Sequence, residues 1–347
     1  MNRLLSLVLL RLGIRKRSWI DHLGDQRRRE LPSLLRRAPP PRDGRKKVLV
    51  YSITPWNQGC VEHILATALR LRGHEVASVI CGGALPDCEM HYYDFKRPAC
   101  EDCVRDAKHV ISAFGITPVL STRYLNDSDL ALASKLTLGK SEEELHALCH
   151  LDIPVGRVAR FQLNVFYQTF VVRTDDLQKE QFRTFCASSI LLTEIAHRIL
   201  EDLKPDVVLE CDGKAFMYRP LYLTARRMGI PVVTWEEHAF DDQMKFVFNH
   251  DSYAGEIHLE SVWDEESRRP LDGGMTARLD RYFERWRRAE NTPFKYHQNT
   301  DRRPEFALES LGIGQGSPII CCFPNMIRDA AAFDRDVAFK SLIDWIL

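Results

Sequence analysis

From residue 46 onward, the positions of hydrophobic and polar residues predict alternating strands and helices. The apolar run "KKVLVYSI" (46–53) predicts a strand, and "HEVASVICGG" (74–83) predicts a second one. Between them lies a stretch of helical period that ends at Gly73. Its predicted apolar face consists of Val61, Ile64, Leu65 and Ala68. Strand, loop, helix and strand in this order are typical of a doubly wound α/β domain.

The same alternation returns later in the chain. Helical spacing predicts helices at 101–115, 176–203, 218–229 and 274–289, and short apolar runs predict strands at 205–210 and 230–235. The predicted buried positions of the long helix are Phe182, Phe185, Ile190, Leu191, Ile195 and Ile199. A capping box opens "SEEEL" (141–145), whereas 151–173 fits neither period. Strands that alternate with helices predict a parallel, Rossmann-like sheet.

The pattern divides the chain into five parts. We expect a basic amino-terminal arm (1–45), a Rossmann-like domain (46–290) with a cysteine-rich insert (81–103), and a polar linker (291–316). Residues 317–347 then predict one strand and one helix. Because these two elements cannot bury their own apolar faces, we expect them to begin a second Rossmann-like domain that is incomplete here.

Charge separates the arm from the rest of the chain. Residues 1–47 carry 14 Lys or Arg and 4 Asp or Glu, so they have a net charge of +10, and the remainder has −10. This charge favours attachment to an anionic membrane surface, although the prolines of "APPPRDGRKK" also fit a disordered basic tail. Few aromatic residues interleave with the basic ones, which disfavours nucleic acid as a partner. Without a signal peptide or a long apolar span, we expect a cytoplasmic protein that is peripheral at the inner face of the cell membrane.

The loops that follow the predicted strands hold the candidate site residues. Ligands of an open parallel sheet bind outside the carboxyl ends of its strands. Candidate substrate-binding residues are Asn57, Gly59, Asp212, Gly213, Lys214 and Arg219, and candidate catalytic residues are His63, Glu236, Glu237 and His238. Mutual repulsion in the Glu–Glu–His triplet could raise the pKa of one member toward that of a general base. The alternative is that these are ordinary solvated loop and helix-cap residues.

Several common nucleotide and nucleophile motifs are missing. No G-x-x-x-x-G-K-[ST] loop is present, no G-x-G-x-x-G follows the first strand, and no G-x-S-x-G occurs. These absences disfavour a P-loop kinase, an NAD enzyme and the common α/β hydrolases.

Four stretches resemble bacterial capsular polysaccharide biosynthesis proteins, within the glycosyltransferases of two Rossmann domains (GT-B type). They are "KVLVYSITPWNQGCVEHILATALRLRGHEV", "CGGALPDCE…RPACEDC", "CDGKAFMYRPLYLTARRMGIPVVTWEEHAF" and "PIICCFPNMIRDAAAF". The resemblance implies an amino-terminal domain that holds a glycan or lipid-linked acceptor and a carboxyl-terminal domain that holds a nucleotide-sugar donor. It places Asn325 and Asp329 on the donor side. Since most of that domain is absent from the sequence, we expect this chain alone to be inactive.

The resemblance also implies a mechanism. A general base, Glu237 or His63, would deprotonate an acceptor hydroxyl, and cationic groups would stabilise the leaving diphosphate. Two alternatives stay open: a non-catalytic, membrane-associated scaffold stabilised by a metal, and a nucleotide-sugar epimerase of the same architecture.

Cysteines cluster in the insert at 81–103. Cys81, Cys88, Cys100 and Cys103 follow the spacing C-x6-C-x11-C-x2-C, which contains a single tight half-site. The pattern favours a structural zinc ion, with His74 and His91 as reserve ligands. An iron–sulfur cluster and reduced packing thiols are the alternatives.

Overall fold

The computed structural model describes most of the chain between residues 44 and 287. The described ranges are 44–53, 57–83, 85–90, 100–167, 176–237, 244–252 and 267–287, together with residues 33, 263 and 312. The arm, the linker and the expected second domain, with Asn325 and Asp329, lie outside these ranges, apart from the few residues just named. So do His91 and His238. At Asn57, Gly59 and Glu237 only the backbone is described.

Within the described ranges, six strands form one sheet in the order β3-β2-β1-β4-β5-β6. The strands are β1 (Lys47–Tyr51), β2 (Glu75–Ile80), β3 (Val119–Leu120), β4 (Val207–Cys211), β5 (Val232–Glu237) and β6 (Met244–Phe248). The first five are parallel, and β6 pairs antiparallel with β5. This strand order is that of a doubly wound sheet and is compatible with a Rossmann-like fold. The prediction of a mainly parallel α/β sheet is therefore confirmed.

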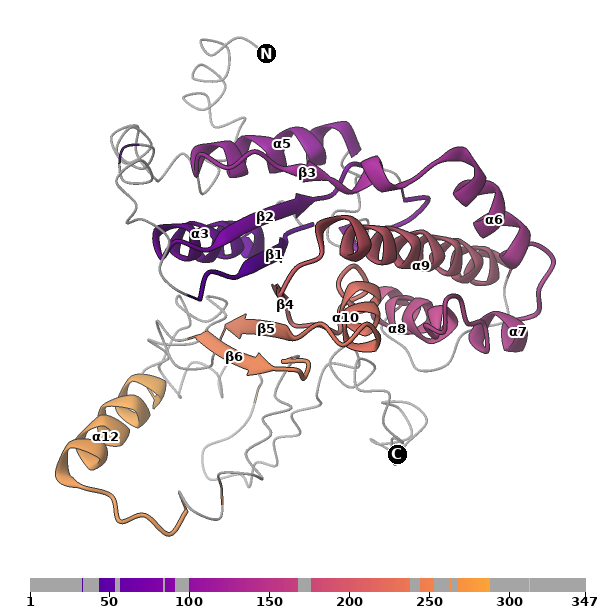
Figure 1. Cartoon of the computed structure of the whole chain (residues 1–347). Coiled ribbons are helices and arrows are strands. Elements are labelled where there is room, and N and C mark those ends of the chain that lie inside the picture. The colour runs from indigo at the N-terminus through magenta and orange to yellow at the C-terminus, as the bar shows by residue number, and fades with distance from the viewer. Residues whose placement is uncertain are drawn as a thin grey trace.

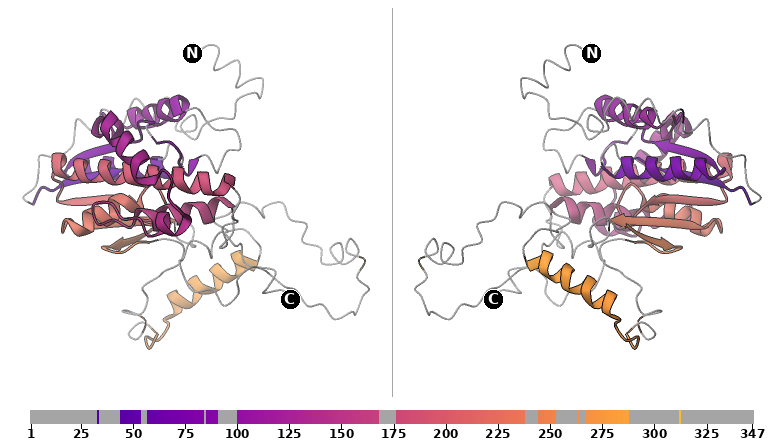
Figure 2. Two further views of the ribbon diagram at one scale, coloured as in Figure 1. Left: turned by 90° about the vertical axis from the view of Figure 1, so that its right-hand side faces the viewer. Right: turned by 90° about the vertical axis from the view of Figure 1, so that its left-hand side faces the viewer.

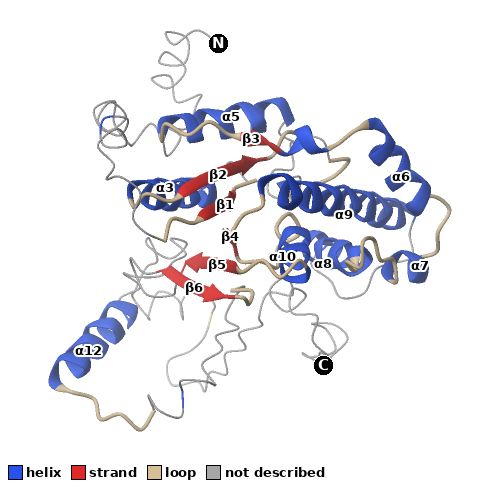
Figure 3. Ribbon diagram, in the orientation of Figure 1, coloured by secondary structure: helices blue, strands red, loops and turns tan. Residues whose placement is uncertain are grey.

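Helices surround the sheet (Figure 1). They are α3 (Asn57–Leu71), α5 (Cys100–Ala113), α6 (Asp127–Thr137), α7 (Glu142–His146), α8 (Val155–Tyr167), α9 (Asp176–Leu203), α10 (Arg219–Arg227) and α12 (Gly273–Arg287), with a 3-10 turn at Ser121–Tyr124. Helix α3 packs on β1, β2 and β4 and against α5, whereas α9 packs with α6, α8 and α10 (Figure 3). Helix α12 stands apart from this body in both views of Figure 2. None of the described helices is long and apolar enough to cross a membrane.

The core confirms most of the predicted periodicity. All six predicted positions of α9 are at most 1% exposed. The predicted apolar face of α3 is wrong in one respect, because Ile64 is 46% exposed. The buried positions of α3 are instead Glu62, His63, Ala66 and Thr67. A helix that buries both a glutamate and a histidine is unusual, since burying a charge is costly.

Candidate functional site

Three carboxyl groups gather where β1 and β4 end. Glu62 lies in the second turn of α3, Glu210 is the penultimate residue of β4, and Asp212 follows that strand. Their exposed fractions are 0%, 0% and 7%. The chain runs outward from β1 to β2 and β3, then returns to β4 on the other side of β1. The acids therefore lie at the carboxyl edge, at the point where the winding of the sheet reverses and where such folds bind ligands.

Glu62 reaches this edge from the face of the sheet that α3 covers. It lies near Ser52, the indole of Trp235 and the backbone N–H of Cys211, whose hydrogen bonding would lower its pKa. In this conformation, however, neither carboxyl oxygen has a described partner within ordinary hydrogen-bond geometry, and neither do Ser52 Oγ and Trp235 Nε1. Burial dominates and raises the pKa of Glu62 to about 8. The group is thus mostly protonated at neutral pH.

Glu210 lies on the other face of the sheet. It is in register with Tyr51 of β1 and Thr234 of β5, and side chains alternate along strands, so these three residues share a face. The Tyr51 ring contacts the ring of Tyr218 on this side, at 6.1 Å between centroids. Burial, with the charges of Asp212 and Glu62, raises the pKa of Glu210 well above its usual range, and only Arg219 opposes the rise. Glu210 is therefore a second buried carboxyl group at this edge whose charged form is disfavoured.

Asp212 differs from both glutamates because part of its carboxyl group is hydrogen-bonded. Its Oδ1 accepts the backbone N–H groups of Lys214 and Ala215, both at 2.7 Å. Its Oδ2 lies 4.0 Å from the sulfur of Cys211, a weak donor. Burial raises the pKa to about 6, the two backbone hydrogen bonds limit the rise, and the charges of Glu236 and Asp251 add to it. Asp212 is thus mainly ionised at neutral pH and can still take up a proton.

A tight turn holds Asp212 in place. Asp212 itself has φ +31° and Gly213 has φ +74°, so two successive residues adopt backbone angles that side chains disfavour. Arg219, at the start of α10, donates to the carbonyl of Gly213 at 3.1 Å and pairs with Asp251 at 3.2 Å. The amide of Ser252 donates to the carbonyl of Asp212 at 2.8 Å. Strain of this kind persists only where surrounding contacts enforce it, and it often marks functional sites.

Replacing Gly213 by Ala is expected to destabilise the protein by about 3 kcal/mol. A Cβ there would lie 2.8 Å from Thr234 Cγ2 and 3.1 Å from Tyr222 Cδ2, in addition to the cost of the positive φ. Gly229→Ala is the matched control, because Gly229 has φ +71° and open space around its Cβ position. Urea denaturation should show a loss of about 1 kcal/mol for the control. Equal losses in the two variants would contradict the close packing of the turn.

The other predicted site residues are only partly brought together. Lys214 follows Asp212 in the turn after β4, and Arg219 is the first residue of α10. Asn57 and Gly59 lie in the first turn of α3 instead of a loop. Glu236 and Glu237 were also expected in a loop, but they belong to β5. The reason is β6, which pairs with β5 up to these residues and sets Lys245 opposite Glu236, with 3.0 Å between Nζ and Oε2.

His63 lies within α3 and not in the loop after β1. It is 2% exposed, and its ring contacts Phe114 at 5.8 Å between centroids. Burial lowers its pKa to about 4, so the imidazole is neutral at physiological pH. The structure therefore places His63 in the packing between α3 and the end of α5.

Two of the three clustered acids, Glu62 and Glu210, were missed by sequence reasoning. A signal existed for Glu210, which interrupts the apolar run of a central strand. For Glu62 the signal was weaker: it precedes Ala66 by one helical turn, and a small residue at that spacing allows close approach to a sheet.

Comparison with sequence profiles of known families, with curated proteins and with solved structures finds no match. The geometry of the site offers one carboxylate that can take up a proton, two buried carboxyl groups whose pKa values are raised, and one arginine at the carboxyl edge of the sheet. Such a set suits a substrate with hydroxyl groups, from which Asp212 could take a proton.

Proposed function

We propose that this chain is the acceptor-side part of a glycosyltransferase of the two-Rossmann-domain type, acting in surface polysaccharide synthesis. The observation that carries the proposal is Asp212: a buried carboxylate whose pKa is about 6, with one oxygen not taken by the backbone, at the winding reversal of a doubly wound sheet. A general base works best when its pKa lies near the working pH.

In the proposed reaction, Asp212 Oδ2 takes the proton of an acceptor hydroxyl. The hydroxyl oxygen forms a bond to the anomeric carbon of the donor sugar, and the bond from that carbon to the phosphate oxygen breaks. The nucleoside diphosphate leaves with the electron pair, and the proton on Asp212 later passes to solvent. Glu62 and Glu210 are fully buried on opposite faces of the sheet, and their raised pKa values reduce the negative charge beside the base.

Asp212 takes the base role that sequence reasoning gave to Glu237 or His63. His63 is buried against Phe114, and its lowered pKa would make it a weak base. The basic arm, with a net charge of +10 over residues 1–47, supports a lipid-linked acceptor at an anionic membrane surface.

Product analysis tests the proposal. The full-length protein is incubated with a panel of nucleotide sugars, with and without a lipid-linked glycan extract. Release of nucleoside diphosphate that depends on acceptor, in step with a labelled sugar in the glycan fraction, is the expected result. Isomerised nucleotide sugar with no release of diphosphate would indicate an epimerase and overturn the proposal. No reaction with any donor would leave the scaffold as the better explanation and would also overturn it.

A further inference from the structure

Four cysteines that are spread over 23 residues of the sequence converge on one small cavity. Cys81 follows the end of β2, Cys88 lies in the loop beyond it, and Cys100 and Cys103 occupy the first turn of α5. All four line a cavity of about 20 Å³. None of them forms a disulfide in this structure. Three segments of the chain thus bring thiols to one place, which spacing in the sequence alone could not establish.

Two glycines permit this convergence. A Cβ on Gly83 would lie 3.1 Å from the Cβ of Cys100, and Gly83 has φ +83°. A Cβ on Gly82 would overlap the side chain of Thr122, at 2.2 Å from Oγ1. Gly83 therefore allows the end of β2 to approach the start of α5, and Gly82 allows it to approach the 3-10 turn that holds Thr122. The conformation at Gly83 also lets its N–H donate to the sulfur of Cys81 at 3.4 Å, a contact that supports a thiolate ligand.

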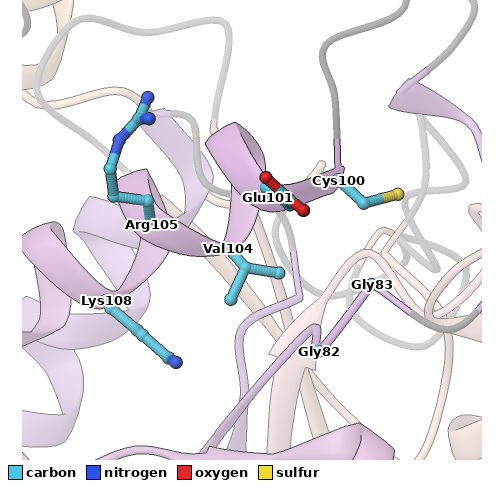
Figure 4. A pocket seen from close by; sticks show the side chains of 7 residues that line it. All are labelled: Gly82, Gly83, Cys100, Glu101, Val104, Arg105 and Lys108. Atoms are coloured by element: carbon cyan, nitrogen blue, oxygen red, sulfur yellow. The ribbon is translucent and has the colours of Figure 1, made fainter.

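The small cavity that the four cysteines share is connected to solvent at one of them. Cys100 is exposed and also lines a larger cavity of about 420 Å³ beside Arg105 and Lys108, which gives the cluster a route to solvent (Figure 4).

We infer that Cys81, Cys88, Cys100 and Cys103 bind one zinc ion. Four thiols would each give up a proton to solvent and form a tetrahedral site with Zn–S bonds of about 2.3 Å. The cavity has room for about one water molecule, so a single ion fits where a cluster of several iron and sulfide atoms does not. Among the described residues, no three Cys, His, Asp or Glu side chains are already positioned to hold a metal, so ligation requires the thiols to rotate toward one another.

The ion would fix the insert against the candidate active site. Ile53, which follows β1, and Met217, in the turn after β4, line the same cavity. Cys81 also lies near Tyr51, whose partner in the sheet is Glu210. Zinc would thus hold the loop after β2 over the edge where the three acids lie. This inference does not depend on the transferase proposal, because binding is measured without a reaction.

Metal content of the chain tests the site. Protein purified anaerobically under reducing conditions and dialysed against a weak chelator should retain about one zinc per chain. Ser in place of Cys81, Cys88, Cys100 or Cys103 should lower the retained zinc at least tenfold. Cys149→Ser is the control, because Cys149 is an exposed free cysteine outside the cavity, and it should retain the ion. Protein without bound metal, or protein that holds iron with acid-labile sulfide, would overturn the inference.

A second measurement uses the unaltered chain and does not depend on how the variants fold. Cobalt(II) added to the metal-free protein should give the intense visible and thiolate charge-transfer bands of a tetrahedral sulfur site, and zinc should displace it. Titration with a mercurial reagent should release zinc only as four thiols react. Weak octahedral cobalt absorption would overturn the four-cysteine site.

Discussion

Replacing Asp212 by Asn is expected to slow sugar transfer by about 10²- to 10⁴-fold while the protein stays folded. Asparagine keeps an oxygen that can accept the backbone N–H groups of Lys214 and Ala215, so the turn has its main contacts. What the variant loses is the ability of the second oxygen to take a proton. The measurement is kcat for sugar transfer by the full-length protein at saturating donor and acceptor.

The pH profile distinguishes a base from a merely structural residue. Asp212 must be ionised to act, so the wild-type rate should rise with pH through about 6, and Asp212→Asn should lack that rise. Asp206→Asn is the matched control. Asp206 precedes the same strand at its opposite end, where its side chain accepts the backbone N–H of Lys47 at 2.7 Å. If Asp212→Asn transfers sugar at the wild-type rate, the base has been assigned wrongly.

Glu62→Gln is expected to make the protein more stable above pH 8 and to leave it nearly unchanged at pH 5. The pKa of Glu62 is raised from 4.5 to about 8 in the folded state, so between these values the folded protein binds a proton that the unfolded chain does not. The contribution of protonated Glu62 to the free energy of unfolding is therefore fully present below about pH 4.5. It is lost progressively as the pH rises from there through 8. At about 1.4 kcal/mol for each pH unit, the full difference is on the order of 5 kcal/mol.

Urea denaturation between pH 5 and 9 measures this effect. The wild-type free energy of unfolding should fall across the range, and the slope should be distinctly shallower in Glu62→Gln. Glu210, whose pKa is also raised, contributes in the same direction and stays in both proteins. Glu75→Gln serves as the control, because Glu75 is half exposed and pairs with Arg45 and Lys47 at the surface. Parallel slopes in wild type and Glu62→Gln would show that Glu62 is ionised in the folded protein.

Sequence periodicity located the elements whose buried positions are large and apolar. The predicted helix 176–203 matches α9, because leucine, isoleucine and phenylalanine mark every turn of its buried side. Helix α8 was not predicted from the hydrophobic pattern, because its buried side includes the small or polar residues Gly156, Ala159 and Gln162. A Cβ on Gly156 would lie 1.9 Å from the carbonyl oxygen of Leu145, so the glycine serves a close contact with α7 that no period reveals. Strand β3 is only two residues long and left no pattern.

The candidate site was predictable only where it lies in a loop. Asp212, Gly213, Lys214 and Arg219 stood out because polar residues directly after a strand face the ligand edge. Glu62 escaped notice because a glutamate within a helix is normally solvated, and only the packing of α3 on the sheet shows that this one is buried. The pKa of Glu62, near 8, results from its burial in that packing, so it cannot be predicted from the neighbouring residues in the sequence.

The pairing of β1 with β4 has a consequence for how the protein folds. Lys47 and Asp206, which hydrogen-bond to each other at the start of these strands, are 159 positions apart in the chain. During synthesis, β1 therefore cannot pair with β4 until the whole helical segment from α6 to α9 has been made. Closing so long a loop is slow, and we expect it to limit the folding rate. Glu62 and Glu210 come from opposite sides of this junction, so we expect both carboxyl groups to stay hydrated until β1 and β4 pair. Until β1 and β4 pair, the carboxyl groups of Glu62 and Glu210 can be ionised in water without any free-energy cost of desolvation.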